Sequence, residues 1–192
     1  MKKILITVLL FTSFISIAQE SDDDQTKKHE ISSNLFDLVV AGSLNVNYEH
    51  LFAKNQSLFL GVTFFDTYGY YDAGYLKSSN AVSLKAAYMI YFSKQKDHEG
   101  FYFYPQLKAR TGEVVLDDYI YFDYENDVYI EEEYKYDVSG FSAGFGIGHK
   151  WLFNNKFTLS INGEIARNLG NFDTDYLDNI EGRFGVNFGY RF

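Results

Sequence analysis

Alternating hydrophobic and polar positions recur along most of the chain. In the segment 180–192, one set of alternate positions is apolar or Gly and the other is polar or Gly. Successive side chains of a strand point to opposite faces, so this pattern predicts a strand with one apolar and one polar face. The same alternation predicts six further strands: 31–40, 43–52, 81–92, 101–110, 140–152 and 157–166. Segment 57–65 is hydrophobic on both faces but strongly strand-like, and it makes the eighth strand. Segment 31–40 fits least well, because Asp37 interrupts either choice of face.

The connections between these segments differ in length. Those at 53–56 and 153–156 are tight turns and that at 93–100 is moderate, whereas three are longer: 69–80, 112–137 and 170–178. Short turns on one rim and long loops on the other are typical of outer-membrane barrels. We therefore predict an all-β fold, an eight-stranded antiparallel up-and-down transmembrane β-barrel with both termini in the periplasm. Alternation alone equally permits a soluble lipocalin-like barrel or a β-sandwich. Strand lengths near the roughly 9–11 residues of a bilayer crossing favour the membrane.

The first residues indicate export. Two lysines precede an apolar run from Ile4 to Ile17, and small residues end it at Ala18. This arrangement predicts a cleaved signal peptide over 1–18, as in a secreted Gram-negative protein. The alternative is a membrane anchor, but a spanning helix needs about 20 apolar residues. The polar segment 19–30 is expected to be a disordered periplasmic leader, and 31–192 the barrel.

Charge and composition narrow the classes of partner. The chain has 26 acidic and 17 basic residues, a net charge of -9 that becomes -11 when Lys2 and Lys3 leave with the signal peptide. Such acidity argues against binding nucleic acid. The absence of Cys excludes disulfides and a lipid-modified Cys. The single proline, Pro105, lies within a predicted strand and lacks an amide donor, so we expect a bulge or a local break in the ladder there.

The polar faces of the predicted strands define a candidate network in the lumen. Its charged members are Glu49, Lys85, Lys108, Arg110, Glu164, Glu181, Arg183 and Arg191. Eight strands leave an interior just wide enough for side chains to fill. The favoured interpretation is a closed lumen packed with ion pairs and tyrosine hydroxyls. The alternative is a narrow channel for small solutes or hydrophobic molecules.

The long segment 112–137 is acidic and rich in tyrosine, and it reads as strand, turn, strand. It predicts a hairpin that extends beyond the bilayer on the outside of the cell. The candidate interaction residues are Asp117, Asp118, Tyr121, Asp123, Tyr124, Glu125, Asp127, Tyr129, Glu131, Glu132 and Glu133. They suit an extracellular protein partner bound by strand addition, divalent cations such as those that bridge lipopolysaccharide, or a solvated loop that prevents aggregation. Their spacing does not match a calcium-binding loop.

Catalysis is the remaining class of function. A barrel enzyme that modifies lipid A would need a nucleophile and a base within reach of each other. His50 and His149 fall near the periplasmic ends of apolar faces, where an interfacial structural role is the favoured interpretation. Gly144, Gly146 and Gly148 lack the helix and Lys of a phosphate loop, and we expect them to make room for bulky neighbours. We predict no enzymatic activity, no cofactor and no metal site.

The chain ends on Tyr190-Arg191-Phe192, which is similar to the terminal-strand signal of outer-membrane barrels. With the signal peptide, the strand pattern and the unequal loops, segment 31–192 resembles the small outer-membrane barrels typified by OmpX, OmpW and the OmpA membrane domain. The resemblance implies the barrel fold and a porin-like protein located in the outer membrane. It also implies contact with membrane lipid and lipopolysaccharide. It implies no single activity, because roles in the family range from adhesion to stress resistance and passage of small molecules.

Overall fold

The computed structural model describes residues 27–67, 76–93, 97–123, 127–169 and 179–192. Strands make up nearly all of its regular structure. Their bounds are β1 His29–Asn34, β2 Leu44–Ala53, β3 Gln56–Phe64, β4 Leu76–Ser79, β5 Val82–Tyr91, β6 Gly100–Thr111, β7 Glu113–Asp123, β8 Val128–Asp137, β9 Gly140–Phe153, β10 Phe157–Asn168 and β11 Ile180–Arg191. One short helix, α2, covers Leu35–Val40.

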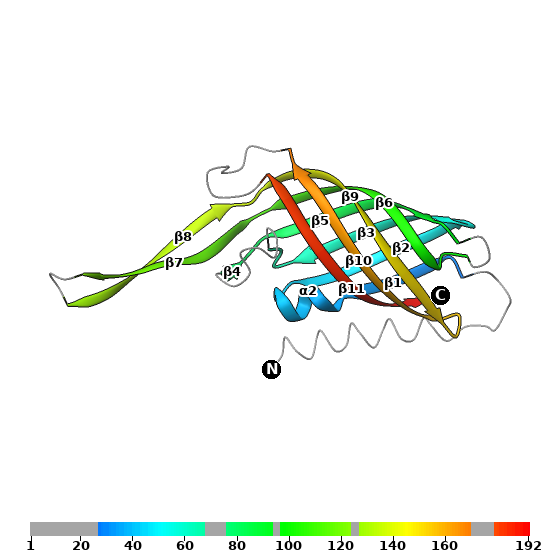
Figure 1. The fold of residues 1–192 in the computed structure, drawn as a ribbon, viewed down its shortest axis with the longest axis horizontal. Helices are drawn as coiled ribbons and strands as arrows, with labels where there is room; N and C mark the ends of the chain where they lie inside the picture. Colours follow the sequence, from blue (N-terminus) through cyan, green and yellow to red (C-terminus); the bar gives the residue numbers. More distant parts are fainter. Residues whose placement is uncertain (1–26, 68–75, 94–96, 124–126, 170–178) are drawn as a thin grey trace, which may run out of the picture.

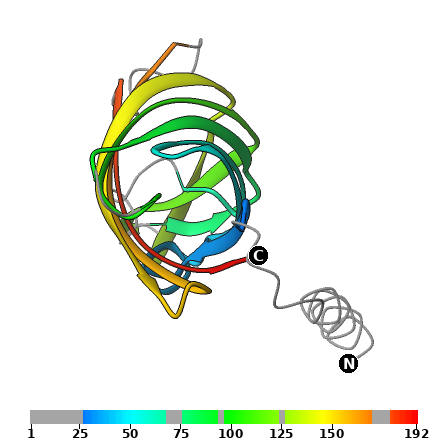
Figure 2. The ribbon, with the colours of Figure 1, turned by 90° about the vertical axis from the view of Figure 1, so that its right-hand side faces the viewer.

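Eight of these strands form a closed antiparallel barrel in the order β1-β11-β10-β9-β6-β5-β3-β2 (Figures 1 and 2). Each strand of the barrel pairs with its neighbours in chain order, and β1 closes the ring against β11. The predicted eight-stranded up-and-down barrel is therefore confirmed. Turns at residues 54–55 and 154–156 join β2 to β3 and β9 to β10 at the end where β11 finishes. The longer connections lie at the opposite end, called here the loop end.

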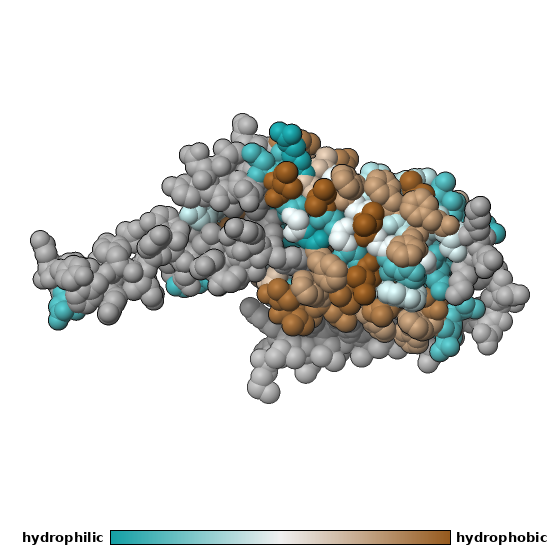
Figure 3. All heavy atoms as spheres, viewed as in Figure 1, coloured by the Kyte–Doolittle hydropathy of each residue, from teal (hydrophilic) through white to brown (hydrophobic). Residues whose placement is uncertain are grey.

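The barrel has the two faces that the alternation predicts. Along β11, for example, Glu181 and Arg191 are buried while Phe184 and Phe188 are exposed. The exposed apolar side chains belong to every strand of the barrel, and Figure 3 shows hydrophobic residues spread over its outer surface. The molecule thus places its polar side chains inside and its apolar side chains outside, the reverse of a water-soluble barrel.

The first predicted strand is wrong in its second half. Strand β1 begins at His29, earlier than the predicted barrel boundary at Ile31, and ends at Asn34, after which α2 replaces the expected strand to Val40. The Asn34 side chain accepts hydrogen bonds from the backbone N–H groups of Phe36 and Asp37, a typical N-cap. Asp37 interrupts the alternation because it lies on the buried side of a helix rather than on a strand.

A second sheet lies beyond the loop end of the barrel. It contains three strands in the order β4-β7-β8, and β7 pairs with β8 from Glu113↔Asp137 to Asp123↔Val128. Gly112, with φ +127°, separates β6 from β7, so the long chain of strands bends where it leaves the barrel. Figure 1 shows β7 and β8 extending well past the barrel. The two predicted strands are present as β7 and β8, and residues 124–126 between them lie outside the described residues. The place of these strands outside the cell stays a prediction.

Pro105 and the inward glycines behave as the sequence indicates. The β5–β6 ladder lapses opposite Pro105, between the pairs Ala87↔Gln106 and Ile90↔Phe103, and the register is kept without a bulge. A Cβ added at Gly146 would lie 2.2 Å from the ring of Tyr104. A Cβ at Gly148 would lie 2.4 Å from the ring of Tyr102. These glycines make room for two large rings in the lumen.

Candidate functional site

The barrel interior holds all eight charged residues of the predicted lumen network. Most are almost fully buried, and Lys85 is the most accessible, with 23% of its side chain exposed. Four further charged residues, which the sequence analysis did not include, join them: Glu30, Asp37, Asp66 and Lys150. The twelve groups fall into three sets along the barrel axis, called here the terminal layer, the middle pair and the loop-side layer.

The terminal layer lies nearest the chain ends and consists of Glu30, Glu49, Lys150 and Arg191. The Lys150 ammonium bridges the two carboxylates, at 2.9 Å from Glu30 and 2.5 Å from Glu49. The Arg191 guanidinium lies 3.0 Å from the other oxygen of Glu30. The hydroxyls of Ser57 and Tyr91 donate to Glu49 at 2.5 and 2.7 Å. Every charge in this layer therefore has a buried partner, as a low-dielectric interior requires.

The middle pair is Lys85 and Glu164, 2.9 Å apart. The Tyr104 hydroxyl donates to the same Glu164 carboxylate at 2.7 Å and accepts from the Asn162 amide at 3.0 Å. The ring of Tyr104 belongs to a buried hydrophobic cluster inside the barrel: Tyr91, Tyr102, Tyr104, Ala87 and Met89. The pair thus joins strands on opposite sides of the barrel across a packed interior.

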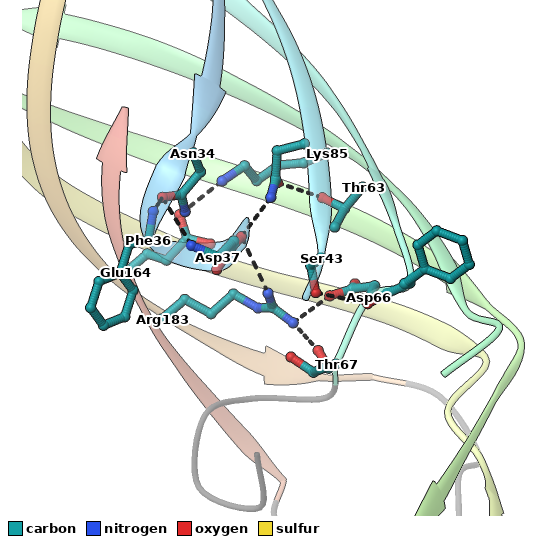
Figure 4. A network of polar contacts seen from close by, with 12 residues as sticks. Asn34, Phe36, Asp37, Ser43, Thr63, Asp66, Thr67, Lys85, Glu164 and Arg183 are labelled. Atoms are coloured by element: carbon teal, nitrogen blue, oxygen red, sulfur yellow. Dashed lines mark hydrogen bonds and ion pairs between the residues drawn. The ribbon is translucent and has the colours of Figure 1, made fainter. Parts of the chain in front are cut away.

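The loop-side layer contains Asp37, Asp66, Lys108, Arg110, Glu181 and Arg183. Glu181 accepts from Lys108 at 2.8 Å and from Arg110 at 2.7 Å, and Asp66 accepts from the same two side chains at 3.0 and 2.9 Å. Arg183 extends the layer toward α2, as Figure 4 shows. It contacts Glu181 at 2.6 Å, Asp66 more closely, and Asp37 at 3.7 Å.

Each layer is electrically balanced. Two acids meet two cations in the terminal layer, one meets one in the middle pair, and three meet three in the loop-side layer. The cavity left among these side chains has a volume of about 50 Å³. That volume has room for a few water molecules and is far below the roughly 300–1,000 Å³ of a typical ligand pocket. The charges of the three layers are therefore balanced, and the cavity among them is small.

The four additional residues differ in how far the sequence could have revealed them. Lys150 continues the inward positions of its strand beyond Gly148, and Glu30 continues those of β1. Extending the predicted faces by one step would have found both. Asp66 was hidden because Phe65 has φ +57°, which breaks the alternation after β3. Asp37 was hidden because it lies in a helix.

The histidines considered for catalysis contact aromatic rings on the barrel wall. His149 lies 4.7 Å from Phe101 and 4.3 Å from Trp151, measured between ring centroids. His50 lies 5.1 Å from His29. Among the described residues, no group of three or more His, Cys, Asp or Glu side chains could hold a metal ion. No helix in the described part of the chain is long and apolar enough to cross a membrane.

Two ionisable groups outside the barrel strands have shifted pKa values. Burial in the connection between β5 and β6 lowers the pKa of His98 below its ordinary value of 6.5. Hydrogen bonds from Ser139 lower the pKa of Asp137, at the end of β8 where the second sheet meets the barrel. Neither group belongs to the three layers.

The predicted interaction residues lie mainly on the second sheet. Asp117, Asp118, Tyr121 and Asp123 belong to β7, and Tyr129, Glu131, Glu132 and Glu133 to β8. Asp127 lies in the turn before β8, and Tyr124 and Glu125 fall outside the described residues. The backbone register places Asp117 opposite Glu133 and Asp118 opposite Glu132. The backbone register therefore pairs acidic positions across the two strands.

The two residues of the terminal motif complete the closure of the barrel. The backbones of Phe192 and His29 exchange hydrogen bonds of 2.8 and 3.0 Å. The ring of Tyr190 stacks with that of Phe192 at 6.4 Å and meets Phe157 edge-on at 5.6 Å. An aromatic group thus lies on the outer surface near the end of the chain, where a membrane interface belt is expected.

Comparison with known proteins finds similarity at the level of structure. The sequence matches no protein-family model and no curated protein. The chain is similar to the N-terminal β-barrel domain of Pseudomonas aeruginosa OprF, at 14% identity over 86% of this chain and 96% of that one, with a TM-score of 0.41. It is also similar to Ail, the attachment invasion locus protein of Yersinia pestis, at 14% identity over 86% of this chain and 94% of that one, with a TM-score of 0.43. At this identity and overlap, the similarity concerns the barrel fold alone.

Proposed function

We propose that this chain is a non-enzymatic outer-membrane barrel with a closed lumen, which carries an acidic sheet outside the cell for interaction with a partner. The observation that carries the proposal is the contrast between the two faces of the barrel. The interior is filled by three balanced layers of charge, and the exterior carries apolar side chains on every strand. Such an exterior is stable only against lipid, because exposing it to water would be costly.

The closed lumen argues for a structural role of the barrel itself. A pore needs a continuous aqueous path, whereas the layers here join opposite strands by direct ion pairs. Removing one lumen cation leaves its layer with an excess negative charge in a buried place, so each layer contributes to stability as a unit. The function is then expected to lie in the surface that the barrel presents.

The second sheet is the surface best suited to that function. Strand β8 pairs with β7 on one edge, and in the described part of the chain no strand pairs with its other edge. A free strand edge can accept an extended segment of another protein through backbone hydrogen bonds. The register pairs acidic positions such as Asp117 and Glu133, and like charges at paired positions are unfavourable, so a positively charged segment is the partner that we expect.

Cell fractionation tests the membrane part of the proposal. The protein should be found in the outer-membrane fraction, and it should migrate differently on a gel before and after boiling, as folded barrels do. A soluble periplasmic or secreted protein without that shift would contradict the proposal. The interaction part is tested by deleting residues 117–133. The shortened protein should keep the heat-dependent shift and lose binding to cells or proteins that the full chain binds.

A further inference from the structure

The barrel wall lacks a strand at one place. Strand β1 pairs with β11 only from Glu30↔Arg191 to Asn34↔Asn187, and with β2 only as far as Ser32↔Asn47. Between residues 180–186 of β11 and residues 44–46 of β2, no strand among the described residues fills the ring. Helix α2 lies there and contacts both strands. We call this part of the wall the β2–β11 seam.

Side chains rather than a backbone ladder close the seam. A single oxygen of Asn34 accepts from the N–H of Val186 on β11 as well as from the two N–H groups at the start of α2. The ring of Phe36 meets that of Phe184 edge-on at 5.2 Å. A helix of six residues is too short to be stable alone. The seam is therefore the part of the wall that can open at least cost to the barrel.

The lumen cavity reaches the seam. Its lining includes Asn34, Asp37 and Arg183, and also Phe184, whose side chain is 41% exposed on the outer face. The outer side of α2 is apolar, because Leu35, Leu38, Val39 and Val40 are all exposed. Polar interior and lipid-facing exterior therefore come together at α2.

The loop-side layer lies behind α2, and its charge balance includes Asp37. The carboxylate of Asp37 lies 3.7 Å from the Arg183 guanidinium, whereas Glu181 lies at 2.6 Å, so Asp37 is the more distant of these two partners of Arg183. If α2 moved outward with Asp37, three cations would face two acids, and the loop-side layer would become positive. The Thr67 hydroxyl, nine-tenths buried or more, has no hydrogen-bond partner among the described residues, although its backbone oxygen accepts from Arg183.

We propose that the β2–β11 seam binds the phosphate-bearing headgroup of a membrane lipid, with α2 as the wall segment that yields to admit it. The phosphate replaces the Asp37 carboxylate beside Arg183, because phosphate and guanidinium form strong paired hydrogen bonds. The Thr67 hydroxyl supplies one more donor. The acyl chains remain on the apolar outer face next to Leu38 and Phe184. A lipid fits better than free phosphate, because the seam opens on the apolar side. The inference rests on the proposed location in the outer membrane.

Binding of short-chain lipids to the purified, detergent-folded protein tests this site. The probes are dihexanoyl phosphatidate, dihexanoyl phosphatidylcholine and inorganic phosphate, measured by isothermal titration. Phosphatidate should bind more tightly than the other two. Asp37→Asn should tighten phosphatidate binding by about tenfold or more, because it removes a competing negative charge within a few ångströms of the phosphate. Glu49→Gln is the matched control, since it neutralises a comparably buried carboxylate in the terminal layer, at the other end of the lumen, and should leave the affinity unchanged.

A second pair of variants keeps the test informative if Asp37→Asn fails to fold. The Asn45 amide donates to Asp37 at 2.8 Å, so Asn45→Ala should loosen Asp37 and tighten binding in the same direction. Asn47→Ala removes a buried amide one inward position away on β2 and should have no effect. The heat-dependent gel shift shows separately that each variant is a folded barrel. Unchanged phosphatidate affinity in both Asp37→Asn and Asn45→Ala would overturn the proposal, and so would equal binding of inorganic phosphate.

Discussion

Replacing Lys150 by Met removes the cation that joins two buried acids. Lys150 is 3% exposed and lies 2.9 Å from Glu30 and 2.5 Å from Glu49. Arg191 still neutralises Glu30 in the variant, so the charge left without a partner is Glu49. Breaking a buried pair in this way costs about 3–5 kcal/mol. Because Ser57 and Tyr91 still donate to Glu49, we expect a loss near the lower end, roughly 3 kcal/mol of the free energy of unfolding.

The assay is urea unfolding of the protein folded in lipid or detergent, with the folded fraction read from gel mobility without boiling. For an m-value of about 1–3 kcal/mol/M, a loss of roughly 3 kcal/mol moves the midpoint down by about 1–3 M. Lys156→Met is the control, because Lys156 is exposed in the turn before β10, and its effect should stay within about 0.5 kcal/mol.

The double variant Lys150→Met with Glu49→Gln tests the reason for the loss. Glutamine keeps an oxygen that accepts from Ser57 and Tyr91, and the layer becomes neutral again with Glu30 and Arg191 paired. The double variant should recover to within about 1 kcal/mol of the natural protein. If its loss equalled the sum of the two single losses, charge balance would not explain the stability of this layer. A Lys150→Met variant as stable as Lys156→Met would refute the argument outright.

Three further predictions concern other parts of the barrel. Asn34→Ala removes the cap of α2 and the bond to the edge of β11, and should lower the unfolding free energy by about 1–3 kcal/mol in urea titration. Gly146→Ala should prevent folding or displace Tyr104, whereas Gly163→Ala, with nothing within 4 Å of its Cβ, should fold normally in the gel-shift assay. Burial lowers the pKa of His98, so the folded state binds fewer protons than the unfolded one, and stability is complete above pH 6.5 and falls below it. His98→Gln should remove that fall when urea midpoints are compared between pH 5 and 8, and an identical pH dependence in the variant would show that His98 is not its source.

The barrel could be predicted from the sequence because its two faces are chemically opposite. Every inward charged side chain needs a place away from lipid, and most outward positions are apolar, so alternation determines strand and face together. The tight turns also follow from local chemistry: Asn154 and Asn155 adopt φ of +52° and +53°, which asparagine tolerates better than most residues. Both features depend on residues that are close together in the chain, so they can be predicted from one sequence.

The pairing partners in the lumen could not be predicted in the same way. Lys85 meets Glu164 across the barrel, from strands far apart in the sequence, and the ring closes only when all strands are placed. Helix α2 was missed because its six residues are fewer than the roughly 11–18 over which a helical period can be recognised, and because Leu38 and Val39 suit a strand equally well. The helix begins at Asn34, whose side chain caps it and also accepts a hydrogen bond from β11. The second of these interactions joins residues far apart in the sequence, so the sequence pattern near Asn34 does not reveal it.

The central claim is that three balanced layers close the lumen of an outer-membrane barrel. Single-channel recording in a planar bilayer tests it most directly, with protein shown to be folded by its heat-dependent gel shift. Closed layers joined by direct ion pairs across the interior, with a cavity of only about 50 Å³, should give no stepwise conductance. Reproducible conductance steps whose size changes when Lys108 is replaced by Met would place this loop-side residue along an open path. That result would contradict the closed lumen.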